Sequence, residues 1–310
     1  MQSKTAEHYD VIIIGGGAAG VSAALWCDEL GLRALLIELS DELGGQLLWT
    51  YNAIKNYLGI EVENGRELQK VFVNQLQARK FELKTNCEVV EIDTENKHVR
   101  TKDNQCFSAT ALIIATGISR RKLNLEGEDK FKGRGIIESG KRDAEKAKDK
   151  KVCIIGGGDA ALENALILSE FAESITLVHR RSAFRGRSEF IERVRQNPKV
   201  KILTETITTK IIGHEFLEAV ELTNLQTKQT FTCQTDILLL RLGVEPNTKL
   251  FQGKIELDED GYCLINSHCE TTVKNIYAIG DVANPLAPTI SGAVGMGAIV
   301  AKIISQTHIS

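Results

Sequence analysis

The sequence predicts an α/β protein with two parallel-sheet domains, and three observations support this prediction. The chain has 310 residues, which indicates two domains at roughly 100–200 residues per domain. Glycine is frequent (26 residues) and proline is rare (4 residues), a balance that favours tight turns between strands and helices. One strand–turn–helix–strand unit occurs twice, and this internal repeat decides the fold class.

The first copy of the repeat spans residues 9–38. Residues 11–14 form a continuous apolar run, which is typical of a buried parallel strand. The glycine-rich turn that follows contains Gly15, Gly17 and Gly20. A helix is predicted for residues 21–30, and a second strand at residues 34–37 leads directly into Glu38.

The second copy spans residues 151–181. It has a predicted strand at 152–155, a helix at 162–173 and a second strand at 174–178. Its turn contains Gly156, Gly158, Asp159 and Ala160, and its second strand ends at His179, Arg180 and Arg181. The spacing from turn to strand end is the same in both copies, from Gly20 to Glu38 and from Ala161 to His179.

Glycine-rich turns between a strand and a helix are typical of dinucleotide-binding sites. The first glycine permits the tight turn, the second lets the backbone approach a pyrophosphate, and the third small residue lets helix and strand pack closely. Unpaired N–H groups at the helix N-terminus then face the phosphates. Because each turn follows a strand, opens a helix and has a polar residue at the next strand end, the sequence predicts two dinucleotide sites.

The two strand ends predict different dinucleotides. Glu38 can accept hydrogen bonds from a ribose diol, which suits FAD, and its charge would repel a 2′-phosphate. The basic residues of the second copy, which include Arg185 one turn further on, can bind a 2′-phosphate through charge-assisted hydrogen bonds. We therefore expect FAD in the first site and NADP(H) in the second.

The sequence resembles the low-molecular-weight thioredoxin reductase family of flavoproteins over nearly its whole length. The resemblance lies in a Gly-Gly-Gln turn at 44–46, an Ala-Thr-Gly segment at 115–117, a Gly-Asp-Val motif at 280–282 and a helix after Pro288. It implies FAD contacts from Gly45, Gln46, Asn56, Val89, Ala115, Thr116, Gly117, Gly280, Asp281 and Ile290. Trp49 and Tyr51 lie near the expected flavin, where they could stack on a ring or belong to the core.

The resemblance also implies the domain organisation. A discontinuous FAD domain is expected over residues 1–117 and 246–310, with an NADP(H) domain inserted at 118–245. Both are expected to be Rossmann-like three-layer domains of the glutathione-reductase type. The resemblance further implies a homodimer.

The resemblance fails at the redox disulfide of that family. The two cysteines of its CxxC motif correspond to Ser139 and Arg142, and Asp143 occupies the place of an acid that protonates a thiolate. Lys141 and Arg142 could bind an anionic partner or belong to a solvated surface. Seven cysteines are present, none at zinc spacing, so no metal site is predicted. Cys263 and Cys269 are the weak candidates for a relocated redox pair.

Composition and charge narrow the functional classes. The net charge of −3 gives no attraction to nucleic acid or to an anionic membrane, and the first ten residues do not resemble a signal peptide. We therefore expect a cytoplasmic protein with reduced thiols.

Three functions remain open. The first is an NADPH-dependent FAD oxidoreductase that passes electrons directly to ferredoxin, flavodoxin, a quinone or a small oxidant. The second is a disulfide oxidoreductase that acts on a thioredoxin-like partner through relocated cysteines, with a second flavin in the NADPH pocket as a variant. The third is a sensor that binds both cofactors with little turnover. No catalytic side chain is identified beyond the weak candidates Asp143, Cys263 and Cys269.

Overall fold

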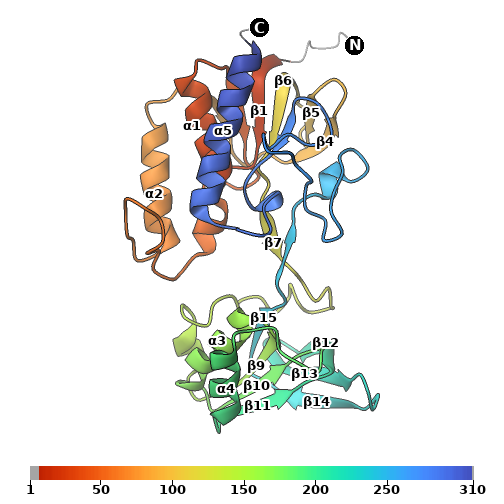
Figure 1. Ribbon diagram of the computed structural model, residues 1–310. Helices are drawn as coiled ribbons and strands as arrows, with labels where there is room; N and C mark the ends of the chain where they lie inside the picture. The colour runs from red at the N-terminus through yellow and green to blue at the C-terminus, as the bar shows by residue number, and fades with distance from the viewer. Residues whose placement is uncertain (1–6, 309–310) are drawn as a thin grey trace. The chain divides into compact units, whose positions relative to one another are not determined.

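The computed structural model describes residues 7–308, which divide into two compact units (Figure 1). Unit 1 comprises the chain up to Ser119 and from Glu245 onward, and unit 2 comprises Arg120–Val244. The expected inserted domain, 118–245, differs from unit 2 by one or two residues at each end. Strands β7 (Ile118–Arg120) and β16 (Val244–Pro246) pair with each other where the chain leaves and re-enters unit 1.

Unit 1 is built on a seven-stranded sheet in the order β3-β2-β1-β6-β5-β4, with β17 also paired to β6. The strands are β1 (Glu7–Ile14), β2 (Ala34–Ile37), β3 (Glu82–Lys84), β4 (Val89–Asp93), β5 (His98–Thr101), β6 (Cys106–Ile114) and β17 (Ile276–Ala278). β1, β2, β3, β6 and β17 run parallel, while β5 is antiparallel to β4 and β6. The parallel strands therefore end at one edge, where the first glycine turn lies.

Alternating residues of β1 enter two different cores. Val11 and Ile13 pack with the helices of one face, whereas Ile12 and Ile14 pack against the β4–β5 side and the segment from Leu250. The helices are α1 (Ala18–Glu29), α2 (Gly65–Leu76) and α5 (Ile290–His308), with short 3₁₀ turns η1 (Gly45–Trp49), η3 (Lys249–Phe251) and η4 (Gly280–Val282). Figure 1 shows the three helices together on one face of the sheet.

Helix α5 is long and apolar enough to cross a membrane by these two criteria, but in the structure it packs along α1. The two backbones approach so closely that a Cβ on Gly297 would lie 2.7 Å from the carbonyl oxygen of Ala19. Of its apolar stretch Ile290–Thr307, 33% is buried, so α5 contributes one side to the core of unit 1.

Unit 2 has three layers. The central sheet is parallel, in the order β11-β10-β9-β15-β8, with α3, α4 and the 3₁₀ turn η2 on one face and an antiparallel sheet β12-β13-β14 on the other. The helical elements are η2 (Ala144–Ala147), α3 (Asp159–Ser169) and α4 (Ser188–Gln196). The strands are β8 (Ile136–Ile137), β9 (Lys151–Gly156), β10 (Ser174–Val178), β11 (Val200–Leu203), β12 (Thr206–Gly213), β13 (Leu217–Asn224), β14 (Thr230–Gln234) and β15 (Ile237–Arg241).

Candidate cofactor sites

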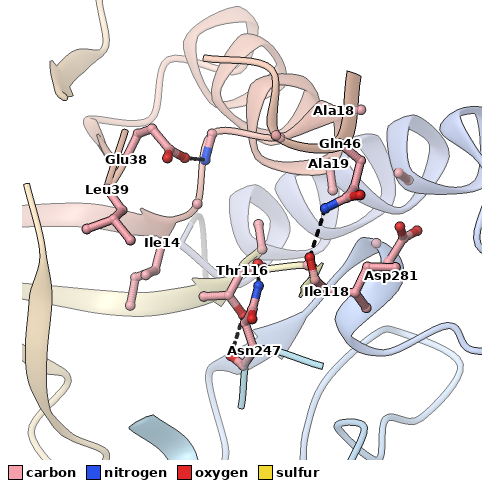
Figure 2. Close-up of a pocket in the computed structure, with 18 of the residues that line it drawn as sticks. Ile14, Ala18, Ala19, Glu38, Leu39, Gln46, Thr116, Ile118, Asn247 and Asp281 are labelled. Atoms are coloured by element: carbon pink, nitrogen blue, oxygen red, sulfur yellow. Dashed lines mark hydrogen bonds between the residues drawn. The ribbon is translucent and has the colours of Figure 1, made fainter. Parts of the chain in front are cut away.

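Unit 1 contains a cavity of about 630 Å³ at the carboxyl ends of its parallel strands (Figure 2). Most of the predicted FAD contacts line it: Gly15, Gly17, Glu38, Gly45, Gln46, Val89, Ala115, Thr116, Gly117, Gly280, Asp281 and Ile290. Gly20 and Asn56 are not among the lining residues. Ligand sites of open α/β sheets are expected at this edge.

Gly20 does not line the cavity, but it allows the close packing of the strand, turn and helix beside it. A Cβ on Gly20 would lie 1.9 Å from the carbonyl oxygen of Gly15, and a Cβ on Gly15 would lie 2.3 Å from that of Ala115. Gly15 also has a φ of +109°, which disfavours any other residue. These contacts bring strand, turn and helix close enough for the turn N–H groups of α1 to face the cavity.

Glu38 is held in place at the end of β2. Its Oε2 accepts a hydrogen bond of 2.6 Å from Gly16 N (Figure 2). Its Oε1 accepts one of 2.8 Å from Ser40 N. Each carboxylate oxygen has two lone pairs, so both retain acceptor capacity for the hydroxyls of a ribose. The arrangement therefore fits the adenosine ribose of FAD.

A second set of hydrogen bonds closes the far side of the cavity. Thr116 Oγ1 donates to Asn247 O at 2.9 Å, and Asn247 Nδ2 donates to Thr116 O at 2.8 Å. Gln46 Nε2 donates to Ile118 O at 2.8 Å (Figure 2). Asn247 was not among the predicted site residues. It lies at the start of the expected second FAD segment, 246–310, which was the one available signal.

The last wall of the cavity consists of Asp281 and the start of α5. Burial raises the pKa of Asp281, whose carboxyl group lines the cavity on η4. Thr289 Oγ1 accepts a hydrogen bond of 3.1 Å from Gly292 N, as an N-cap residue does. Free N–H groups of a first helical turn can receive an electron-rich ligand atom, so this wall suits the polar edge of a flavin.

The two aromatic residues near the cavity differ in their positions. Trp49 lines the cavity and its side chain is 47% exposed, which excludes the core alternative for this residue. Tyr51 is half-buried and is not a lining residue.

In unit 2 the second glycine turn lies against His179. A Cβ on Gly157 would lie 2.2 Å from the His179 ring, which is 8% exposed and stacks on Phe184. Burial lowers the pKa of His179, and its Nε2 contacts Ala183 O at 3.1 Å. The neutral ring therefore supports the turn from below and is poorly placed to carry charge to a phosphate.

The segment after β10 folds back toward the start of α3. Arg185 N donates to Gly157 O at 2.8 Å, and Arg187 N donates to Asp159 Oδ1 at 2.7 Å. Arg180 and Arg185 are exposed. Within residues 7–308, no carboxylate forms an ion pair with Arg180, Arg181 or Arg185, so all three guanidinium groups are available to an anion.

In the turn at 139–143, Asp143 is buried and bound by several donors. Asp143 is 3% exposed, accepts hydrogen bonds from Glu138 N and Ser139 N at 3.3 and 3.2 Å, and pairs with Arg142 and Lys146 at 2.7 and 2.9 Å. Desolvation raises the pKa of Asp143, but these donors outweigh it and hold the pKa well below its usual range. A carboxylate so stabilised in its charged form is a poor proton donor, which argues against Asp143 as a catalytic acid.

Cys263 and Cys269 do not form a disulfide. Both are buried free thiols, and they belong to the two separate cores on opposite faces of the unit 1 sheet. Burial raises the pKa of Cys263 to about 12 and also raises that of Cys269. Neither thiol is therefore activated as a nucleophile.

Comparison with known proteins identifies the family. The family described as pyridine nucleotide-disulphide oxidoreductase matches residues 9–297. The chain belongs to this family. A thioredoxin reductase of Mycolicibacterium smegmatis is 32% identical over 298 residues, which cover 95% of each chain. A 34.2 kDa protein in the rubredoxin operon of Clostridium pasteurianum is 29% identical over 305 residues, or 98% of each chain.

Solved structures agree with this family assignment. The thioredoxin reductase of Lactococcus lactis matches with a TM-score of 0.81 and 29% identity, covering 97% of this chain and 99% of that one. The predicted resemblance and the fold of two Rossmann-like domains are thereby confirmed. As a thioredoxin-reductase-like member of the family, the protein is an FAD-dependent NAD(P)H oxidoreductase with FAD and NADP(H) as cofactors.

Proposed function

We propose that this protein is an NADPH-dependent FAD oxidoreductase that delivers electrons directly to an acceptor, without a protein disulfide in between. The observation that carries the proposal is the turn at 139–143, which holds Ser-Gly-Lys-Arg-Asp and ties its acid into an ion pair between Asp143 and Arg142. The buried, unpaired state of Cys263 and Cys269 supports it further.

FAD is assigned to unit 1, whose cavity fits the parts of that molecule. Glu38 would bind the adenosine ribose, the turn at Gly15–Gly17 would face the diphosphate, and the N-terminus of α5 would face the flavin. The residues contribute position and electrostatic field. Bound FAD and NADP(H) supply the redox chemistry, a hydride transfer from nicotinamide to flavin followed by delivery of two electrons to the acceptor.

NADP(H) is assigned to unit 2. Its glycine turn opens α3, and Arg180, Arg181 and Arg185 follow β10, the strand next to β9 in the sheet. These arginines have no carboxylate ion-pair partner among the described residues, so a 2′-phosphate would complete the cluster. We expect NADPH to be strongly preferred over NADH for this reason.

A small redox protein is the acceptor that we propose. The relative in the rubredoxin operon of Clostridium pasteurianum supports an association of such chains with a small redox protein. Trp49 adds a structural argument, because it lines the unit 1 cavity and is 47% exposed. An aromatic side chain in this position offers a contact to a partner that must approach the flavin.

An anaerobic titration tests the proposal. The purified, FAD-loaded protein is titrated with NADPH while the flavin absorbance is followed, and the electrons taken up per subunit are counted. Uptake of two electrons supports the proposal, and the C263S and C269S variants should give the same count. Uptake of four electrons in the parent protein would overturn it, because a second redox centre would then be present.

A further inference from the structure

Arg241 is the last residue of β15 and lies beside the glycine turn of unit 2. It is the register partner of Gly156, and a Cβ on Gly156 would lie 2.4 Å from Arg241 O. Because β15 and β9 are parallel, the Arg241 side chain leaves the sheet at the edge where ligands bind.

Two guanidinium groups, those of Arg241 and Arg120, donate hydrogen bonds to the same carbonyl oxygen. Arg241 Nη2 donates to Glu138 O at 2.9 Å, and Arg120 Nη1 donates to the same oxygen at 2.8 Å. The two donating nitrogens therefore lie within two hydrogen-bond lengths of each other. Glu138 directly follows β8, the strand next to β15, so this oxygen also lies at the carboxyl edge.

Neither guanidinium has a counter-charge in contact. Within residues 7–308, no carboxylate forms an ion pair with Arg120 or Arg241, and Glu163 acts on Arg241 only at a distance. Burial, and next the charge of Arg120, lower the pKa of Arg241 to about 10, so the Arg241 guanidinium is still charged at neutral pH. Two like charges held together in this way are unfavourable unless an anion joins them.

A buried side chain also contacts the Arg241 guanidinium. Asn164 is 8% exposed, and its Oδ1 accepts from Gly140 N at 2.8 Å and contacts Arg241 Nη2 at 3.5 Å. Its Nδ2 donates to Ala160 O at 2.6 Å in the first turn of α3. Asn164 thereby links Arg241 to the helix whose N-terminus opens at the same edge.

The sheet order indicates which part of a dinucleotide lies here. From β9 the chain proceeds outward through β10 and β11, and then returns to β15 on the other side of β9. A dinucleotide is expected to cross this switch point. The 2′-phosphate would lie over β10, at Arg180 and Arg185, while the part beyond the adenosine would lie toward β15.

We propose that Arg120 and Arg241 form a second oxyanion site of unit 2, which binds the diphosphate of the nicotinamide cofactor between β9 and β15. The inference rests on the proposed NADP(H) site and adds positioning residues to it. Because NADH and NADPH share the diphosphate, this site should contribute to both, whereas the Arg180–Arg185 cluster should act on NADPH alone.

Substitution separates the two sites. Arg241→Gln and Arg120→Gln should each weaken the binding of NADP⁺ and NAD⁺ to the full-length FAD-loaded protein by the same factor, roughly 10-fold or more. Arg185→Gln should weaken NADP⁺ alone. Arg241→Lys should recover part of the loss, since charge returns without the planar donor geometry. Arg195→Gln, an exposed change on α4, is the matched control and should alter neither affinity.

Inorganic pyrophosphate identifies the source of the anion. It should compete with NADP⁺ in the parent protein and lose this effect in Arg241→Gln and Arg120→Gln. If pyrophosphate binding is lost while both dinucleotides bind normally, the site serves an anion of another molecule and the cofactor assignment is overturned. If neither variant changes any of these affinities, the oxyanion site itself is overturned.

Arg241 is partly buried, so its variants could fail to fold. Arg120 is exposed, so Arg120→Gln still tests the site in that event. Failure of the parent protein to bind NADP⁺ would refute the proposed function separately, because pyrophosphate would still report on this site.

Discussion

Gly16 N donates a hydrogen bond of 2.6 Å to Glu38 Oε2, which joins the first glycine turn to the end of the neighbouring strand. The carboxylate that is expected to bind the ribose is thus also part of the turn that faces the diphosphate. A Cβ on Gly16 would lie 3.0 Å from the same oxygen and 2.4 Å from Leu43 Cδ2, so a larger residue would crowd this contact. Binding of ribose and of diphosphate should therefore be coupled in unit 1.

Replacement of Glu38 by glutamine tests the assignment of this carboxylate to FAD. The amide keeps the shape but loses the charge and one acceptor, so we expect FAD affinity to fall by roughly 10-fold to 100-fold. Titration of the apoprotein with FAD, followed by flavin fluorescence, measures the change. The E42Q variant is the control, because Glu42 pairs with Arg66 and does not line the cavity. An unchanged affinity in E38Q would contradict the assignment of Glu38 to FAD.

Two glycines of the same turn should respond differently to alanine. In Gly20→Ala the new Cβ would lie 1.9 Å from Gly15 O, so the apoprotein should lose about 2–4 kcal/mol of unfolding free energy. In Gly17→Ala the nearest atom is 3.9 Å away, and the fold should be unaffected. Gly17 lines the cavity, however, so its variant should bind FAD weakly. Urea unfolding and FAD titration separate these effects, and equal stability of the two apoproteins would refute the packing argument.

Asp143 should stabilise unit 2 in a pH-dependent manner. Its folded pKa lies below the ordinary carboxyl value of 3.8, so its contribution is present above that pH and disappears as the pH falls through the folded pKa. Asp143→Asn should therefore cost about 2–3 kcal/mol at pH 7 and progressively less below pH 4. Urea unfolding at several pH values, with Asp149→Asn as an exposed control, measures this difference. A cost independent of pH would show that the ion pairs with Arg142 and Lys146 contribute little.

Asp281 should show the opposite pH dependence. Burial raises its pKa in the folded protein, so the charged carboxylate destabilises the apoprotein at neutral pH and the cost is relieved as the pH falls below the folded value. Asp281→Asn should make the apoprotein more stable at pH 7 and equally stable at low pH. Its FAD affinity should nevertheless fall, because Asp281 lines the cavity. Loss of both stability and affinity would indicate a structural role instead.

Features that depend on residues close together in the chain could be predicted from the sequence alone. The two βαβ units, the glycines of their turns and the residues at their strand ends follow from local backbone geometry and from strand and helix periodicity. The cofactor types also follow from the sequence, because charge at a strand end selects between a ribose diol and a 2′-phosphate. The cysteine-free stretch at 139–142 was likewise visible in the sequence.

Features that depend on segments far apart in the chain became visible in the three-dimensional fold. It placed His179 beneath Gly157, put Cys263 and Cys269 in different cores, and joined Asn247 to Thr116 across 131 residues. It also brought Arg120 and Arg241 to one carbonyl oxygen. Sequence spacing does not predict such long-range contacts, because they depend on which strands lie next to each other and which side chains their packing buries.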